Sequence, residues 1–250
     1  MPESDSILEE LGLTPVWRTR TASTIGAAES AAAEALPSLD VKAPKKEFEV
    51  ISEPVSEVSE TPISLLDWDT LKARVANCTR CRLCEKRNHT VFGIGDEKAS
   101  WMLVGEAPGA NEDRLGEPFV GQAGKLLDNM LRAVGRTREN GIYIANVIKC
   151  RPPGNRDPQL DEVAQCEPYL KRQLAIIRPQ LILALGRFAA QSLLKTDASI
   201  SSLRTRVHQY EGVPVIVTYH PAYLLRNLPD KAKAWADLCR AQEIYQAMNH

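Results

Sequence analysis

The chain has 250 residues, and its hydrophobic (44%) and charged (25%) fractions are ordinary for a soluble globular protein. It contains no apolar run of roughly 18 residues, which excludes a helical membrane span, and its acidic N-terminus carries no secretory signal, so we expect a cytoplasmic protein. The net charge of −1 combines residues 1–60, with 12 acidic and 5 basic side chains, and residues 61–250, with 20 and 26. The basic part permits a polyanionic partner without requiring one.

Residues 1–62 are predicted to form a flexible, disordered acidic leader ahead of a folded domain at 63–250. The stretch 21–60 is rich in Ala, Ser, Glu, Pro and Thr and holds one aromatic residue, so it cannot bury enough surface to offset its loss of conformational entropy. Residues 7–17 place apolar side chains at helical spacing. This short segment either docks on a protein partner or folds back on the domain.

From Ser64 onward the sequence alternates between predicted helices and strands. Helices are predicted at 64–78, with Ser64 as N-cap, and at 123–134, 159–177, 186–195 and 231–247. Short apolar runs at 101–105, 142–147, 180–185 and 213–218 are typical of buried parallel strands. This order predicts an α/β fold, a three-layer α/β/α sandwich around a four-stranded, mainly parallel sheet. In such sheets ligands bind beyond the carboxyl ends of the strands, so the loops that follow them are the candidate site.

Three of these loops carry an unusual set of residues. They read GEAPGANED and EPFVGQAG (105–113 and 117–124), NVIKCRPPGNRDP (146–158) and HPAYLLR (220–226). They contain neither the GxGxxG dinucleotide fingerprint nor the GK[ST] of a phosphate-binding P-loop. Their glycines, carboxylates, Phe, Asn and His suit a pocket for a flat polar ring, in which an aromatic stacks, an amide reads an edge and a His meets developing negative charge.

The six cysteines form a second group of candidate functional residues. Cys78 and Cys81 form a CxxC pair, and together with Cys150 and Cys166 they can supply four thiolates to an iron–sulfur cluster or to structural zinc. Cys84 extends the pair to CxxCxxC and is a competing ligand. Cys239 lies among apolar residues of a predicted helix, which favours a buried small hydrophobe.

Six sequence blocks together resemble the family 4 uracil-DNA glycosylases, the iron–sulfur members of the uracil-DNA glycosylase superfamily. The blocks are NCTRCRLCEKR, VFGIGD, GEAPG with ED, PFVGQAG, NVIKCRPPGNRDP and HPAYLLR, in order over about residues 64–248. The resemblance implies a structural [4Fe–4S] cluster on Cys78, Cys81, Cys150 and Cys166, with Cys84 as a non-ligand. It also implies a monofunctional DNA repair enzyme that flips uracil out of DNA and hydrolyses its N-glycosidic bond, leaving an abasic site.

The same resemblance assigns the base pocket to Gly105, Ala107, Phe119, Asn146 and His220. Phe119 stacks on the uracil ring, and the Asn146 amide reads the O4 and N3–H edge that distinguishes uracil from cytosine. His220 donates to the uracil O2 as the leaving base becomes anionic. Backbone N–H groups of 105–107 line the same pocket.

The carboxylate that assists the reaction is harder to assign. Better-known branches of the superfamily carry Asp or Asn where this chain has Ala107, so the role of orienting water or stabilising the cationic sugar must pass to another residue or be absent. Glu106 and Glu112 are the candidates, and Asn155 is a further candidate for orienting water or a phosphate. Lys149 is interpreted as a surface or phosphate contact, because a monofunctional enzyme needs no Schiff-base lysine.

Uracil-containing DNA, single- or double-stranded, is the expected partner of a monomeric protein. Arg151, Arg156 and Arg226 are the candidate phosphate contacts. Leu224, Leu225 or Arg226 is expected to wedge into the base stack where the flipped nucleotide leaves a gap.

Two other functions remain open from the sequence. The first is a non-catalytic DNA- or uracil-binding module of the same fold. A uracil-trapping branch of the superfamily carries an inserted basic loop (KRRIH-like) after the second strand, and this chain has no such insertion. The second is a zinc-stabilised α/β protein that acts on a nucleotide or another small molecule.

Overall fold

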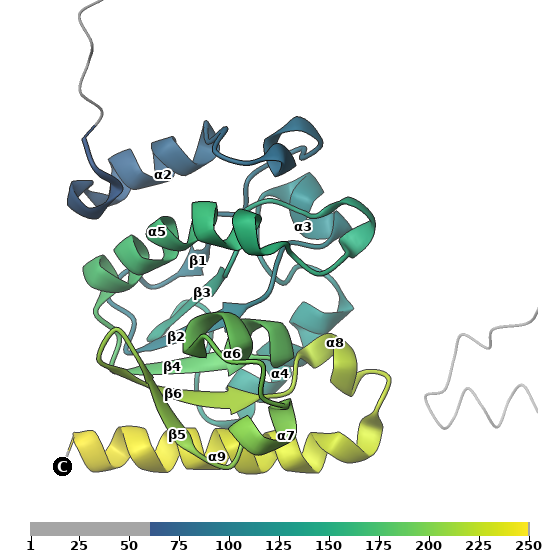
Figure 1. The fold of residues 1–250 in the computed structure, drawn as a ribbon. Coiled ribbons are helices and arrows are strands. Elements are labelled where there is room, and N and C mark those ends of the chain that lie inside the picture. Colours follow the sequence, from purple (N-terminus) through teal and green to yellow (C-terminus); the bar gives the residue numbers. More distant parts are fainter. Residues whose placement is uncertain (1–60, 250) are drawn as a thin grey trace, which may run out of the picture. The chain divides into compact units, whose positions relative to one another are not determined.

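The structure is a computed structural model that describes residues 61–249 (Figure 1). Nearly all of the predicted leader at 1–62, including the segment 7–17, lies outside the described residues. No helix among the described residues is both long enough and apolar enough to span a membrane.

A mixed sheet of six strands, in the order β1-β3-β2-β4-β6-β5, forms the centre of the fold. The four inner strands are parallel: β3 (Ile142–Asn146), β2 (Trp101–Gly105), β4 (Leu181–Leu185) and β6 (Val213–Thr218). The edge strands β1 (Ile94–Gly95) and β5 (Val207–Tyr210) pair antiparallel with their neighbours. The α/β class is confirmed, but the predicted count of four strands is wrong. The edge strands escape prediction because β1 has only two residues and half of the residues in β5 are polar.

Helices cover both faces of the sheet. They are α2 (Trp68–Ala76), α3 (Ala110–Leu115), α4 (Gln122–Ala133), α5 (Leu160–Ile177), α6 (Arg187–Leu194), α7 (Ile200–Leu203), α8 (Pro221–Leu224) and α9 (Lys231–Met248). One apolar cluster joins α2, α5 and α6 to one face, and a second joins α4 and α9 to the other (Figure 1). In β2 the side chains alternate between the clusters, since Met102 belongs to the first and Leu103 to the second.

The first predicted helix begins later than expected. The side chain of Asp67 accepts a hydrogen bond from the Thr70 N–H at 2.8 Å and caps α2, whereas residues 63–65 form one turn of 3-10 helix. Ser64 is therefore not the N-cap.

The parallel strands end at one edge of the sheet. Gly105 at the end of β2 lies opposite Asn146 at the end of β3, and Leu185 of β4 lies opposite Thr218 of β6. Every residue of β2, β3 and β4 is buried, which explains their uninterrupted apolar sequences. The three unusual loops therefore begin next to one another.

Candidate active site

A pocket of about 480 Å³ opens at the carboxyl ends of β2, β3 and β6. Residues predicted from the sequence line it from three directions. Glu106, Ala107, Glu112 and Phe119 follow β2, Asn146, Asn155 and Arg156 follow β3, and His220 and Arg226 follow β6. The predicted convergence of these loops is confirmed.

Gly105 lies beneath the pocket and makes room for two of its side chains. A Cβ atom at this position would lie 2.4 Å from Asn146 Oδ1 and 2.9 Å from Phe119 Cζ. Gly124 has a similar role, because a Cβ atom there would lie 1.6 Å from the Phe119 carbonyl oxygen. Gly105 lets the Asn146 amide and the Phe119 ring approach the end of β2 closely, and Gly124 lets the Phe119 backbone approach α4.

Asn146 lines the pocket, and its side chain carries an unpartnered acceptor beside Gly105. The residue is 2% exposed, and its Oδ1 is buried with no hydrogen-bond partner among the described residues. A buried polar atom without a partner costs about 1–3 kcal/mol. An N–H group of a bound ligand would remove that cost, so this atom marks a place for a hydrogen-bond donor.

Lys149 supports Asn146 from inside the protein. Its Nζ donates to the Asn146 backbone oxygen at 3.0 Å and to Gln173 Oε1 at 2.6 Å. The predicted surface or phosphate contact is therefore wrong, because Lys149 is 1% exposed. The two oxygen atoms make burial of the Lys149 ammonium group possible, although the sequence alone suggests only a loop residue at this position.

His220 caps the short helix α8 and is held as a neutral imidazole. Its Nδ1 accepts a hydrogen bond from the Ala222 N–H at 3.1 Å, so Nε2 is the nitrogen that carries hydrogen. Burial lowers the pKa of His220 to about 4, and the nearby charge of Arg226 acts in the same direction. Near neutral pH, His220 therefore offers an uncharged Nε2–H donor to the pocket.

Phe119 packs against His220 on a rigidly held loop. The two rings are stacked, with centroids 5.5 Å apart and an interplanar angle of 28°. Phe119 has a left-handed backbone, with φ of 55°, and Arg138 fixes it by donating to the carbonyl oxygens of Pro118 at 2.9 Å and Phe119 at 2.6 Å. Asp128 holds Arg138 in turn, at 2.6 Å. The aromatic ring is thus positioned before any ligand arrives.

Glu112 holds the same loop from the other side. Its Oε1 accepts hydrogen bonds from the backbone N–H groups of Val120 at 3.1 Å and Gly121 at 3.3 Å. A side chain at Gly109 would approach the other oxygen, Oε2, to 2.7 Å. This carboxylate lines the pocket, and one of its oxygens is already committed to the loop.

Glu106 is the carboxyl group in the pocket whose ionisation is most strongly altered. Burial raises its pKa to about 7, and the neighbouring charge of Asp157 adds to that rise. Arg187, which forms an ion pair with Asp157 at 3.3 Å, acts in the opposite direction. Glu106 therefore changes charge close to neutral pH.

Polar side chains of the loop after β3 form hydrogen bonds with one another and with the start of α5. Arg156 forms two hydrogen bonds with Glu162, at 2.5 and 2.9 Å, and Arg151 Nε donates to Asn155 Oδ1 at 2.7 Å. Arg156 and Asn155 still line the pocket, whereas Arg151 does not. These contacts shape a loop that the sequence shows only as a set of independent residues.

The two leucines of HPAYLLR differ. Leu224 is 1% exposed and packs with Tyr219 and Ala234, so the prediction that it wedges into DNA is wrong. Leu225 is 42% exposed and stays available at the surface. The four-residue helix α8 directs one leucine into the protein and the next towards solvent. The sequence, which predicts a loop for this segment, does not show that difference.

Two polar residues that line the pocket were missed from the sequence. Asp157 follows Arg156 directly, and Tyr223 lies within HPAYLLR. The Tyr223 hydroxyl donates to Asp230 Oδ2 at 2.6 Å. Both lie in loops already singled out, but only the fold shows which of their side chains reach the pocket.

A second, smaller cavity is lined by four of the six cysteines. Cys78, Cys81, Cys150 and Cys166 all border it, whereas Cys84 and Cys239 do not. The space that water can enter between these side chains is only about 10 Å³, so the four thiols lie close around a narrow gap. The four predicted ligands are therefore brought together from the end of α2, the loop after β3 and α5.

The chemistry of this cavity suits a group that binds through several thiolates. Arg87 Nη1 lies 3.3 Å from Cys150 Sγ, and the Lys149 backbone N–H donates to Cys166 Sγ at 3.2 Å. Burial raises the pKa of Cys150 to about 11 and that of Cys166 to about 12. N–H groups aimed at the sulfurs are the contacts that tune an iron–sulfur cluster. Within residues 61–249, no group of three or more His, Cys, Asp or Glu side chains is arranged around a single metal ion.

Comparison with known proteins gives consistent matches. The model of the uracil DNA glycosylase superfamily matches residues 92–239. A protein of Archaeoglobus fulgidus named type-4 uracil-DNA glycosylase is 47% identical over 165 residues, which is 63% of this chain and 82% of that protein. Proteins with the same name are 44% identical in Sulfurisphaera tokodaii (64% and 76% covered) and 41% identical in Saccharolobus solfataricus (70% and 85% covered).

Proposed function

The chain belongs to the uracil-DNA glycosylase superfamily, and from that membership we propose that it excises uracil from DNA by hydrolysing the N-glycosidic bond. The product is an abasic site, and the reaction serves DNA repair. The similarity to proteins named type-4 uracil-DNA glycosylase supports this assignment. The observation that carries it in the structure is the buried, unpartnered Asn146 Oδ1 in the same pocket as a neutral His220 donor.

Base recognition is assigned to Asn146 and Phe119. The Asn146 Oδ1 accepts the N3–H of uracil, and its Nδ2 donates to O4. Cytosine presents an acceptor and a donor in the opposite order, so the same amide rejects it. The Phe119 ring supplies a stacking face for the flipped base.

His220 stabilises the leaving uracil. As the glycosidic bond breaks, negative charge develops on the base, and the Nε2–H of His220 donates to its O2. The donor is uncharged because burial lowers the pKa of His220 to about 4. A fixed donor aimed at developing charge is where a catalytic site gains most.

Glu106 is the best-placed carboxylate for the sugar side of the reaction. In its ionised form it stabilises the cationic sugar or orients the attacking water. Glu112 acts mainly by holding the Phe119 loop, because its Oε1 is occupied by two backbone N–H groups. Asn155 is held by Arg151 and remains a candidate for orienting water or a phosphate.

Replacing Glu106 with glutamine is expected to remove a pH dependence in both stability and activity. The pKa of Glu106 is raised from its ordinary value of 4.5 to about 7. Its contribution to stability is therefore complete below pH 4.5 and is lost as the pH rises towards 7, because the unfolded chain ionises first. Relative to wild type, Glu106→Gln should become more stable between pH 5 and pH 8 in urea unfolding.

The excision rate should move in the opposite direction. The wild-type rate should rise towards pH 7 as Glu106 ionises, whereas Glu106→Gln should stay slow and lack that rise. Asp161→Asn, on the exposed start of α5, is the control. A pH profile of Glu106→Gln identical to that of wild type would remove Glu106 from the mechanism.

DNA contact is assigned to the rim of the pocket, within a glycosylase domain at residues 63–250. Arg226, Arg156 and Arg151 are the proposed phosphate contacts, and Leu225 is the proposed wedge. The protein acts as a monomer on single- or double-stranded DNA in this proposal.

We also assign a [4Fe–4S] cluster to Cys78, Cys81, Cys150 and Cys166. The four thiols border one cavity, and N–H groups point at two of the sulfurs. When bound, such a group joins the CxxC segment to the loop after β3 and to α5, so its contribution is structural.

Substitution of Cys166 with serine is expected to abolish the cluster. The protein should lose its brown colour and its bound iron and sulfide, and its melting temperature should fall, because metal binding contributes to folding. Cys84→Ser and Cys239→Ser are matched controls that should keep all three properties. A wild-type chain that binds one zinc ion and no iron would contradict the cluster, and loss of iron in Cys84→Ser would contradict the ligand set.

The function itself is tested on a uracil-containing oligonucleotide. Purified protein should generate alkali-labile sites only at uracil, and an otherwise identical strand with thymine should remain intact. Release of free uracil confirms hydrolysis. Protein that binds the uracil strand without releasing the base would instead support a non-catalytic binding module.

A further inference from the structure

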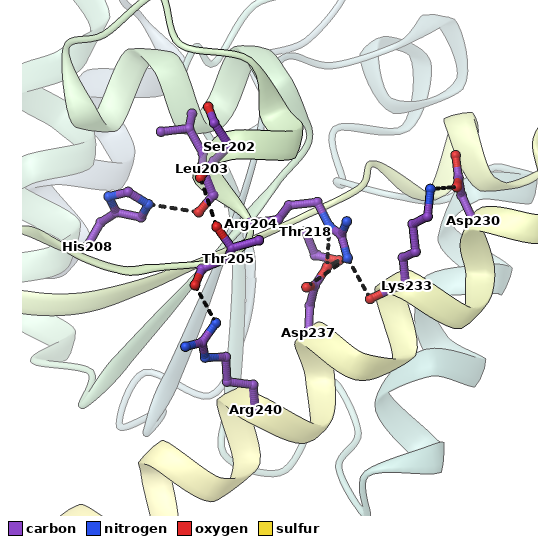
Figure 2. A network of polar contacts seen from close by, with 10 residues as sticks. All are labelled: Ser202, Leu203, Arg204, Thr205, His208, Thr218, Asp230, Lys233, Asp237 and Arg240. Carbon is purple, nitrogen blue, oxygen red and sulfur yellow. Dashed lines mark hydrogen bonds and ion pairs between the residues drawn. The ribbon is translucent and has the colours of Figure 1, made fainter.

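The segment that carries His220 is anchored on both sides by one helix. On the strand side, Thr218 Oγ1 donates to Asp237 Oδ2 at 2.8 Å. On the other side, the Tyr223 hydroxyl donates to Asp230 Oδ2 at 2.6 Å. Asp237 lies within α9 and Asp230 is the N-cap that precedes it, as Figure 2 shows. Residues 218–223 are therefore attached to α9 at both ends.

Arg204 connects this anchor to α7. It forms two hydrogen bonds with Asp237, at 2.7 and 2.9 Å, and a third with the Lys233 carbonyl oxygen at 2.8 Å (Figure 2). The side chains of Arg204 and Asp237 are only 11% and 7% exposed. Such a two-pronged, shielded ion pair fixes the direction of both side chains.

A column of flat groups runs from this ion pair to the pocket. The Arg204 guanidinium lies over the Tyr219 ring, 4.4 Å from its centroid. Tyr219 is stacked in turn on Tyr223, with centroids 5.0 Å apart and an interplanar angle of 20°. Tyr223 lines the pocket. Tyr219, directly before His220, and Tyr223, within α8, are thus both held by this column.

His220 needs such support because its own helix is short. With four residues, α8 cannot hold its orientation alone, since isolated helices of this length are unstable. Hydrogen bonding from Nε2 depends on the position of the ring, and a displacement of about 1 Å can cost about 100-fold in rate. The stability of the fold does not by itself call for a buried ion pair here, since well-packed apolar residues serve equally well.

We propose that Asp237, together with Arg204, is a positioning residue for uracil excision, which acts by fixing Thr218 and Tyr219 and thereby the imidazole of His220. This inference rests on the proposed function. It predicts that Asp237 and Arg204, which do not line the pocket, affect the rate of excision.

The test is a double-mutant cycle with His220. Asp237→Asn keeps the size of the side chain but weakens both the ion pair and the bond to Thr218. The chemical step should slow about 10- to 100-fold at saturating enzyme, whereas affinity for DNA with an uncleavable uracil analogue should change less than about twofold. In a His220→Ala background, Asp237→Asn should have no further effect, because residues that act through one another are not additive.

A matched control comes from the same helix. Arg240 Nη1 donates to the Thr205 carbonyl oxygen at 2.7 Å, which ties α9 to the segment after α7 through a hydrogen bond other than those to Thr218 and Tyr223 (Figure 2). Arg240→Gln should therefore leave the chemical step unchanged. If Asp237→Asn fails to fold, the double-mutant cycle with His220 can be made with Thr218→Val instead. That substitution removes only the hydroxyl group that joins β6 to Asp237.

The outcomes separate the two proposals. An unchanged chemical step in the folded variant, or an equal loss with and without His220, would overturn the positioning role while leaving uracil excision intact. A wild-type protein that does not excise uracil would overturn the function instead. In that event the positioning role is tested by the ¹⁵N chemical shifts of the His220 ring. Asp237→Asn should alter the Nε2 signal, and unchanged shifts would refute the inference.

Discussion

Replacing His220 with alanine is expected to slow single-turnover excision of uracil about 100- to 1000-fold, the usual cost of removing a donor to a developing anion. The Ala222 N–H occupies Nδ1, so Nε2–H is the only ring donor that the pocket can use. The loss should fall on the rate more than on the affinity for DNA.

The pH dependence identifies the form of His220 that acts. Because burial lowers its pKa to about 4, the imidazole stays neutral from pH 5 to pH 8 and should contribute no step in the rate over that range. His208 is the matched control, since its Nε2 contacts the Leu203 carbonyl oxygen at 2.8 Å on another face of the domain. A loss of less than about tenfold in His220→Ala would contradict the role as donor.

Replacing Asn146 with alanine is expected to slow excision about 30- to 150-fold, which corresponds to about 2–3 kcal/mol for the lost hydrogen bonds to the base. The stability of the protein should fall far less than its activity. Asn146 Oδ1 has no partner among the described residues, so its removal breaks no protein hydrogen bond at that atom. A side chain that lowers the stability of the protein but is needed for its activity is typical of a binding site.

Measurement of both properties in the same samples makes this test specific. Excision rates, inhibition by free uracil and urea unfolding should be compared for Asn146→Ala and for Asn129→Ala, an exposed amide on α4 that contacts Arg132. Asn146→Ala should bind free uracil more weakly, whereas Asn129→Ala should match wild type. Equal inhibition of wild type and Asn146→Ala by uracil would show that the amide does not read the base.

Much of the fold could be predicted because the four inner strands are recognisable in the sequence. The strands β2, β3, β4 and β6 are apolar runs, and parallel strands must bring their carboxyl ends to one edge, which placed Asn146 and His220 together. The edge strand β5 could not be found in this way. It is half polar, and it exists because β6 offers a partner, not because its own sequence demands extension.

The site was less predictable where side chains find partners far along the chain. Lys149 and Leu224 were expected at the surface, yet Lys149 is buried on Asn146 and Gln173, and Leu224 packs with Tyr219 and Ala234. Glu112 reads as a catalytic carboxylate until its contacts with the Phe119 loop are seen. A sequence reports which groups are present near a site, whereas packing decides which of them are already occupied.

Lys149 also sets a condition on any redesign of this protein. Its backbone N–H donates to Cys166 Sγ, while its ammonium group donates to the carbonyl oxygen of Asn146. A cofactor-free version with apolar residues in place of the four cysteines would deprive that N–H of its acceptor, three residues from the amide that meets the base. Such an engineered enzyme would need a substitute acceptor at position 166, and threonine or serine there would be the first choice.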